Sequence, residues 1–229
     1  MSTFLRLEDI RKSYAGPDGQ TEVLGGINLE VEQGQTIAIV GPSGCGKSTL
    51  LNIIGLLDRP TAGKVILEER ELTSLSDTEA AKVRNQKIGF VFQMHHLLPQ
   101  CSVLENVLLP TLAGDKKLPV KEFQSRAEEL LERVGLKDRI HHRPGQLSAG
   151  QRQRAAIVRA MILRPVLLLA DEPTGALDRD NAGQIVELMV EMNWHEDVTL
   201  IVATHSMELA GKMERRYQLT QGVLRQSKI

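Results

Sequence analysis

The sequence predicts an α/β domain with a mostly parallel central sheet, and two observations lead to this prediction. First, short apolar runs rich in branched side chains stand at 36–40 (TIAIV), 166–171 (VLLLAD) and 199–205 (TLIVATH). Such continuous runs are typical of strands that are buried on both faces. Second, each run is followed by a stretch with helical spacing, and this alternation is how parallel strands are connected.

The chain begins with a predicted antiparallel β subdomain. Two strand-like stretches, FLRLEDIRKSY at 4–14 and EVLGGINLEVEQG at 22–34, lie on either side of GPDG at 16–19. We expect GPDG to form the turn between them, because its residue types favour turns. The other elements expected before residue 94 are a strand at 36–40, a helix at 47–57 and strands at 64–69 (KVILEE) and 88–93 (IGFVFQ).

An α-helical subdomain is expected at about 94–164, inserted between strands of the core. In its helix at 120–134, one face carries the apolar residues Val120, Phe123, Ala127, Leu130 and Val134. Gly135 then ends that helix, and Pro165 ends a second helix expected at 148–164. We interpret residues 1–229 as a single domain that contains this insertion.

Composition limits the classes of function open to the chain. The 229 residues carry 28 basic and 29 acidic side chains, so no basic surface indicates a nucleic-acid partner. No apolar run approaches the roughly 20 residues that span a bilayer, and the first residues lack a secretory leader. Two cysteines, Cys45 and Cys101, make no disulfide framework. We therefore expect a cytoplasmic protein that reaches a membrane only through a partner.

The strongest motif is GPSGCGKST, which stands between a predicted strand and a predicted helix. Its spacing, Gly-x-x-x-x-Gly-Lys-Ser, fits the phosphate-binding loop, in which glycines let backbone amides surround a phosphate. Lys47 would reach the β- and γ-phosphates, and the hydroxyl of Ser48 would bind Mg²⁺. A glycine-rich turn with a chance lysine is the alternative. The residues expected to bind nucleotide here are Gly41, Pro42, Ser43, Gly44, Cys45, Gly46, Lys47, Ser48 and Thr49.

Two adjacent carboxylates follow the apolar run at 166–170. Asp171, at the strand end, is a candidate to hold Mg²⁺ through water, and Glu172 is a candidate to orient or deprotonate an attacking water. Such a pair is costly unless a cation or a water-filled site receives it, although a helix-capping pair is the alternative. Together with the phosphate loop, the carboxylates predict a P-loop nucleoside triphosphatase core.

LSAGQ at 147–151 resembles the signature motif of ATP-binding cassette (ABC) proteins, and the family's other motifs appear in order. They are an aromatic residue for adenine, a glutamine after IGFVF, the acidic strand end with the D-loop in DEPTGALD, and a switch histidine in IVATHS. The resemblance implies ATP and Mg²⁺ as ligands. It implies Glu172, His205, Gln93 and Lys47 for catalysis; Tyr14, Ser148, Ala149, Gly150, Gln151 and Asp178, besides the phosphate loop, for nucleotide; and Ser48, Gln93 and Asp171 for the metal.

The resemblance also implies a homodimer. Two chains of the family pack head to tail around two ATP molecules, each held between the phosphate loop of one chain and the signature helix of the other. Ser148 and the amides of Ala149 and Gly150 would form this second anion site at a helix start. The usual motif has glycine where this chain has Ala149, and the added methyl group narrows the backbone conformations open to that position.

A chain with one such domain and no coiled coil resembles a transporter subunit that works with a separate membrane permease or transmitter. The membrane subunit is expected to dock near 94–110, where the sequence is apolar and its apolar residues are expected to lie on the surface. This segment, HRPGQLSAGQRQR and LADEPTGALD most resemble the lipoprotein-releasing, macrolide-efflux and cell-division group. We expect an ATPase peripheral to the cytoplasmic face of the inner membrane that powers lipoprotein release. A macrolide- or peptide-efflux ATPase and a nucleotide-gated regulatory or scaffold subunit stay open as alternatives.

Overall fold

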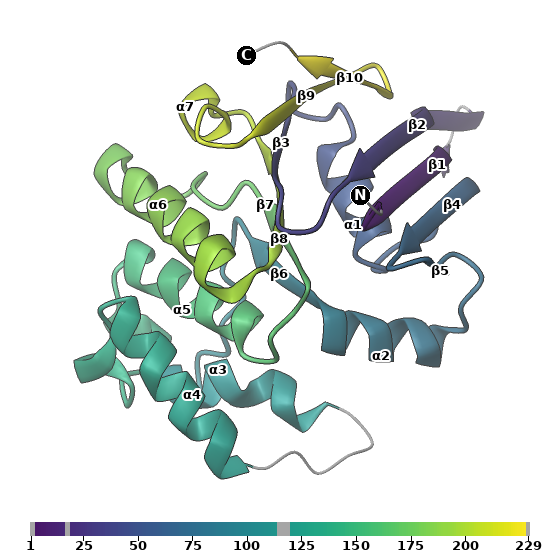
Figure 1. Ribbon diagram of the computed structural model, residues 1–229. Helices are drawn as coiled ribbons and strands as arrows, with labels where there is room; N and C mark the ends of the chain where they lie inside the picture. Colours follow the sequence, from purple (N-terminus) through teal and green to yellow (C-terminus); the bar gives the residue numbers. More distant parts are fainter. Residues whose placement is uncertain (1–2, 17–18, 114–119, 228–229) are drawn as a thin grey trace.

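A six-stranded, mostly parallel sheet forms the centre of the chain (Figure 1). In the computed structural model, which describes residues 3–16, 19–113 and 120–227, the strand order is β10-β9-β3-β8-β7-β6. All neighbouring strands are parallel except β9 and β10. The strands are β3 (Thr36–Val40), β6 (Ile88–Phe92), β7 (Leu167–Asp171), β8 (Thr199–Thr204), β9 (Arg215–Thr220) and β10 (Val223–Ser227). This arrangement confirms the predicted fold class.

Helices cover both faces of this sheet. Successive residues of a strand point to opposite faces, and all five residues of β3 are buried. Ile37 and Ile39 pack in one core with helix α1 (Lys47–Ile54), whereas Ala38 and Val40 pack in another core with helix α5 (Ala149–Met161). The sheet therefore divides the interior in two, and α1 and α5 lie on opposite sides of it.

A second, antiparallel sheet confirms the predicted front subdomain. Its order is β2-β1-β4-β5, made of β1 (Leu5–Gly16), β2 (Gly19–Val31), β4 (Ala62–Leu67) and β5 (Arg70–Glu71). Strands β1 and β2 pair as far as Gly16 and Gly19, while Pro17 and Asp18 of the expected turn lie outside the described residues. The strand expected to continue to residue 69 ends at 67, because Glu68 and Glu69 have φ of 48° and 65° and form a turn.

Between β6 and β7 the chain is largely helical, as expected. The elements there are α3 (Val103–Leu108), η1 (Leu109–Leu112), α4 (Val120–Arg133), η2 (Lys137–Arg139), η3 (Pro144–Gln146) and α5. In and after α4, Ala127, Leu130 and Val134 are buried, and Gly135 ends the helix with a φ of 71°. The side chain of Val120, also expected on this face, lies outside the described residues.

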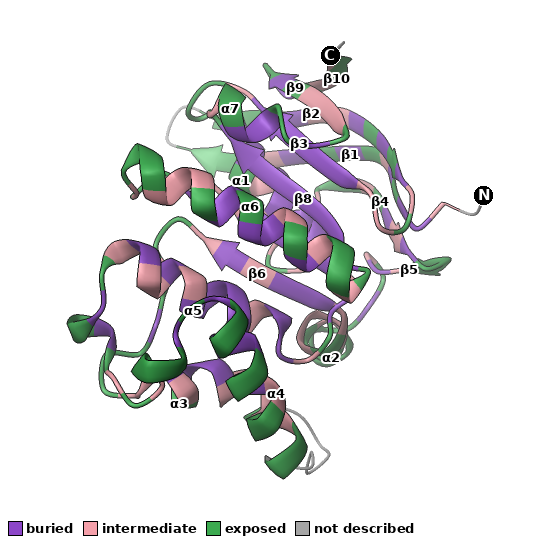
Figure 2. Cartoon of the chain, turned by 60° about the vertical axis from the view of Figure 1, so that its left-hand side comes forward, coloured by how far each residue is buried: buried purple, intermediate pink, exposed green. Residues whose placement is uncertain are grey.

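The remaining helices are α2 (Asp77–Lys87), α6 (Arg179–Glu196) and α7 (Met207–Ala210). Helix α2 was not predicted, although its capping box of Ser76 and Glu79 is a helix-start pattern that the sequence contains. Helix α6 lies over the same face of the sheet as α5, and its outer side is exposed (Figure 2). Near its end stands the only tryptophan, Trp194, with 83% of its surface exposed.

Candidate active site

The loop between β3 and α1 has a backbone that only glycine accommodates at two points. A Cβ on Gly41 would lie 2.4 Å from the backbone oxygen of Leu219, so no side chain fits there. Gly46 has a φ of 103° and precedes α1 without capping it by a side chain. The amides at the start of α1 are therefore left for another acceptor, which is the property expected of a phosphate loop.

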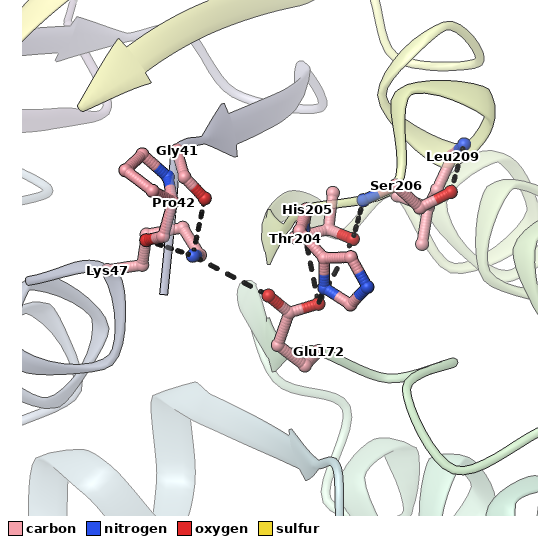
Figure 3. A network of polar contacts seen from close by, with 8 residues as sticks. All are labelled: Gly41, Pro42, Lys47, Glu172, Thr204, His205, Ser206 and Leu209. Carbon is pink, nitrogen blue, oxygen red and sulfur yellow. Dashed lines mark hydrogen bonds and ion pairs between the residues drawn. The ribbon is translucent and has the colours of Figure 1, made fainter. Parts of the chain in front are cut away.

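Lys47 links this loop to the end of β7. Its Nζ donates to the carbonyl oxygens of Gly41 at 2.8 Å and Pro42 at 3.1 Å, and it lies 3.6 Å from Oε1 of Glu172 (Figure 3). The lysine side chain is buried, so these oxygens compensate a charge that would otherwise be costly. The ammonium group therefore stands between the phosphate loop and the predicted catalytic carboxylate.

Glu172 connects the ends of β7 and β8. Its Oε2 lies 2.9 Å from Nδ1 of His205, and it accepts a hydrogen bond from the His205 amide at 3.2 Å and from the Thr204 hydroxyl at 3.3 Å. The residue has a φ of 45°, a conformation that is uncommon outside glycine and that is often found at functional sites. Lys47, Glu172 and His205, chosen separately from the sequence, thus lie in one network (Figure 3).

The carboxylate of Asp171 stands at the end of β7. Its Oδ1 is buried and makes no hydrogen bond to any of the described residues. Burial raises the pKa of Asp171, and a contact with the Ser48 hydroxyl offsets part of that rise. Divalent Mg²⁺ takes oxygen ligands, so an orphan carboxylate oxygen beside a hydroxyl fits this ion. The residues present therefore suit the metal that the sequence predicts.

Gln93 lies next to this carboxylate pair. It follows β6, where Phe92 pairs with Asp171 of β7. Its side chain packs on Gly175, where a Cβ would lie 2.9 Å from Nε2 of Gln93. The side chain of Gln153, on α5, holds the loop by donating to the Phe92 oxygen at 3.0 Å. Gln93, predicted for catalysis and as a metal ligand, thus stands beside the strand end that carries Asp171.

The start of α5 is a preformed helix N-terminus. Ser148 caps it by accepting from the Gln151 amide at 3.2 Å, and Gln151 Oε1 accepts from the Ser148 amide at 2.9 Å. Ala149 is the first helical residue and has no positive φ, so the methyl group that distinguishes this motif meets no backbone restriction. Gly150 is constrained instead, because a Cβ there would lie 2.7 Å from Oδ1 of Asn181.

Asp178 caps α6. Its Oδ1 accepts from the Asn181 amide at 2.9 Å and its Oδ2 from the Asn181 side chain at 2.7 Å. These two hydrogen bonds, the amide first, lower the pKa of Asp178. The structure thus gives Asp178 a local role as a helix cap, and its contact with nucleotide stays a prediction.

Tyr14 is held at the edge of the antiparallel sheet. Its hydroxyl donates to Oδ2 of Asp58 at 2.7 Å, and Nζ of Lys12 lies 4.7 Å from the ring centroid. The residue is 43% exposed, so the ring is available for stacking. Its contact with adenine stays a prediction.

The segment expected to dock a membrane subunit is less exposed than the sequence suggested. Leu97, Val103 and Val107 are buried in the core on the α5 side of the sheet, so the expectation that the apolar residues of 94–110 lie on the surface is wrong for these three. Their apolar character serves the interior instead. Met94 is 62% exposed and Leu98 is 39% exposed, and they leave a smaller apolar surface than expected.

Apart from Tyr14 in β1 and Asp178 at the start of α6, the predicted residues fall into two groups. The phosphate loop, both carboxylates, Gln93 and His205 surround the carboxyl ends of the central strands, while the signature residues lie at the start of α5 on the other side of the sheet from α1. Sequence reasoning missed Thr204, which contacts Glu172, and Asn181, which contacts Gly150. Thr204 directly precedes the predicted histidine at a strand end, and this position was the available signal.

Comparisons with known proteins agree on one family. The family described as "ABC transporter" matches residues 24–175. A similar protein is the lipoprotein-releasing system ATP-binding protein LolD of Saccharophagus degradans, 49% identical over 226 residues that make up 98% of each chain.

Solved structures agree as well. The ATP-binding cassette MJ0796, in a dimeric post-hydrolysis state bound to ADP and Pi, matches with a TM-score of 0.89 and 39% identity over 98% of both chains. CbiO1 of Clostridium perfringens, part of the ABC transporter complex cbiONQ, matches with a TM-score of 0.86 and 30% identity over 98% of this chain and 88% of that one.

Proposed function

Because this chain belongs to the ABC transporter family, we propose that it is the ATP-hydrolysing subunit of a complex that releases lipoproteins from a membrane. The nearly full-length similarity to a lipoprotein-releasing ATP-binding protein favours this substrate over macrolides or peptides. ATP binding would close two copies of the chain, hydrolysis would open them, and a separate membrane subunit would use this movement.

The network around Glu172 supports the roles of individual residues. Contacts to the carbonyl oxygens of Gly41 and Pro42 hold the Lys47 ammonium group at the start of α1. When nucleotide binds, Lys47 would exchange these contacts for the β- and γ-phosphates. Glu172 would orient the attacking water and accept its proton. His205, 2.9 Å from Glu172, would hold the carboxylate in place and contact the γ-phosphate.

Three residues would hold Mg²⁺. The Ser48 hydroxyl is a suitable oxygen donor, and so is Oδ1 of Asp171, which has no hydrogen-bond partner among the described residues. The Gln93 amide stands at the neighbouring strand end. The ion would neutralise the negative charge that develops on the phosphates. The same residues would place the terminal phosphate in front of Glu172, so that the water it holds is in line for attack.

The observation that carries the two-chain mechanism is the position of α5. Because α1 and α5 pack on opposite faces of the sheet, the phosphate loop and the Ser148 helix start of one chain are set on different sides of it. Each helix start is suited to an anion, yet each offers only part of a site. Two chains in a head-to-tail arrangement would bring the two parts together around each ATP.

The test is the substitution Glu172→Gln, which keeps the shape of the side chain and removes its ability to accept a proton. We expect the variant to bind ATP without hydrolysing it and to elute as a dimer in gel filtration with ATP and Mg²⁺, while ADP leaves it monomeric. Lys47→Ala in the same background is the control, because it removes the phosphate contact and should abolish the dimer. A Glu172→Gln chain that stays monomeric with Mg²⁺-ATP would contradict the proposal.

The scaffold alternative makes a different prediction for turnover. A nucleotide-gated regulatory subunit would bind ATP and show negligible hydrolysis even with its membrane partner. The proposal requires steady-state hydrolysis that Glu172→Gln abolishes, because the only change is at the carboxylate that acts on water. Measuring phosphate release from the wild-type chain with and without the membrane subunit separates the two functions.

We also propose that the chain works at the cytoplasmic face of the inner membrane, held there by the membrane subunit. Within the described residues, no helix combines the length and the apolar character needed to cross a bilayer. The exposed side chains of Met94 and Leu98 support docking near 94–110, since both stand directly after Gln93 or close to it and would transmit movement to the site.

A further inference from the structure

Asn181, in the first turn of α6, contacts both the D-loop and the start of α5, the two elements that would reach the partner's ATP. Its amide nitrogen Nδ2 donates to Oδ2 of Asp178 at 2.7 Å, and its backbone amide donates to Oδ1 at 2.9 Å. On its other side, Oδ1 of Asn181 would lie 2.7 Å from a Cβ on Gly150, so the side chain packs directly on the start of α5. One half-buried amide thus joins the D-loop to the signature helix.

A second contact extends this junction by one turn. Arg154, four residues after Gly150, bonds the side chain of Gln184, three residues after Asn181. Another nitrogen of Arg154 donates to the Val134 oxygen at 3.1 Å. Residues three or four apart share one face of a helix, so the two contacts fix the register of α5 against α6.

We propose that Asn181 is a positioning residue that holds Asp178 and the Ser148 helix start as one rigid unit, so that both reach the partner's ATP together. This inference rests on the proposed function, because it requires a site shared between two chains. Asn181 would act through Asp178 and Gly150, not on the phosphates. A neutral amide suits this place, since it bonds the Asp178 carboxylate without adding negative charge near a triphosphate.

The role predicts that loss of Asn181 damages only the site completed by the altered chain's signature helix. Its own phosphate loop, on the other side of the sheet, would still work with a normal partner. A general structural role predicts damage to both sites, because an unstable chain presents neither element correctly. The two roles are therefore separated by asking which of the two sites fails.

The experiment uses two full-length copies joined by a flexible linker, one of which carries Lys47→Ala and so has one inactive phosphate loop. Asn181→Ala is then placed either in the same copy or in the other copy. In the same-copy arrangement, the remaining active loop faces the altered signature helix. In the other-copy arrangement, the active loop faces an unaltered signature helix. Single-turnover hydrolysis and retention of labelled ATP are measured for both.

We expect the same-copy arrangement to lose hydrolysis by about ten- to a hundredfold relative to the linked dimer with Lys47→Ala alone, since small misplacements at a reacting centre have effects of this size. The other-copy arrangement should match that reference. ATP retention should follow the same order, so it reports on the shared site even if hydrolysis with one inactive loop is slow.

Gln184→Ala is the matched control, because it loosens the same pair of helices without touching Asp178 or Gly150. It should cost hydrolysis much less than Asn181→Ala in the same copy, because Asn181 still contacts both Asp178 and Gly150. Equal losses in the two arrangements would overturn the inference in favour of a structural role, and no loss in either would overturn it outright. If Glu172→Gln forms the ATP dimer and these outcomes still occur, the inference alone fails and the proposed function stands.

Discussion

At the scale of single residues, the site is a set of charges that hold one another in place. Lys47 is satisfied by two loop carbonyls and by Glu172, and Glu172 is satisfied by His205 and Thr204. A nucleotide that enters the loop must therefore draw Lys47 away from existing partners. Asp171 is the exception, because its buried Oδ1 has no partner among the described residues.

Asp171→Asn tests whether this carboxylate is kept at a cost to stability. Burial raises the pKa of Asp171 in the folded chain, so its contribution to stability is fully present below the pKa of the unfolded state and is lost as the pH rises through the folded pKa. Asparagine has no charge to lose. Without nucleotide and Mg²⁺, we expect the variant to have a higher melting temperature than wild type at neutral pH.

The difference in stability between the variant and wild type should shrink as the pH falls below the ordinary range of an aspartate carboxyl. At such pH the Asp171 carboxyl of wild type is also uncharged. Mg²⁺-ATP should reverse the order, because wild type then gains stability from binding that the variant lacks. Thermal melts at several pH values, with and without Mg²⁺-ATP, make both comparisons. A variant less stable than wild type at neutral pH without ligand would show that another interaction of Asp171 dominates.

Residues of the candidate site could be predicted from the sequence where they belong to a local motif. The phosphate loop, the carboxylate pair and the signature serine each combine residue type with position at the end of a strand or the start of a helix. Asn181 could not be found in this way, because its partner Gly150 lies on a different helix and only the packing of α5 on α6 brings them together.

At the scale of elements, a strand could be predicted from the sequence when its residues are buried and therefore form an apolar run. The five residues of β3 are all buried and form one apolar run, so the strand was evident. Strand β10 lies at the edge of the sheet, and its residues VLRQS are largely exposed or half-buried, so it carries no such pattern. Helix α2 has no fully buried residue, and only its capping box marked it.

Gly55→Ala tests how closely α1 approaches the central sheet. Gly55 has a φ of −85°, which alanine adopts freely, so backbone strain is not at issue. A Cβ there would lie 1.8 Å from Cζ of Phe90, a half-buried residue of β6. We expect the variant to lose about 1–3 kcal/mol of unfolding free energy through overpacking, measured by urea denaturation.

Phe90→Leu supplies the control for this packing effect. The smaller side chain removes the ring that the new methyl group would meet, so the double variant should recover part of the loss. Additive losses in the double variant would contradict the packing explanation. Since α1 begins at the phosphate loop, nucleotide affinity should fall in Gly55→Ala and recover together with stability.

At the scale of the whole molecule, the central sheet separates the two helix starts that are proposed to bind anions. Helices α1 and α5 pack against alternate residues of the same strands, so their starts belong to different faces. The fold class followed from the sequence because it depends on strand and helix periodicity. The separation of the two faces required the structure, since it depends on which strand neighbours which.

This separation predicts a concentration dependence. If each ATP needs two chains, hydrolysis per chain should rise with chain concentration while dimers are scarce and then level off as dimers predominate. Dilution series of the wild-type chain without its membrane subunit, at saturating Mg²⁺-ATP, measure this directly. A rate per chain that stays constant over a hundredfold dilution, in chains shown to be monomeric at the low end, would indicate a site complete within one chain.

The lone indole at position 194 gives the protein a built-in optical reporter. It stands in solvent near the far end of the helix that Asp178 caps, so all tryptophan emission originates from one water-exposed spot. The wavelength of its emission maximum should remain that of a solvated ring through binding and turnover of nucleotide. A blue shift would appear only when another surface covers that end of α6. The intrinsic fluorescence of the unlabelled protein can therefore report the binding of a partner there.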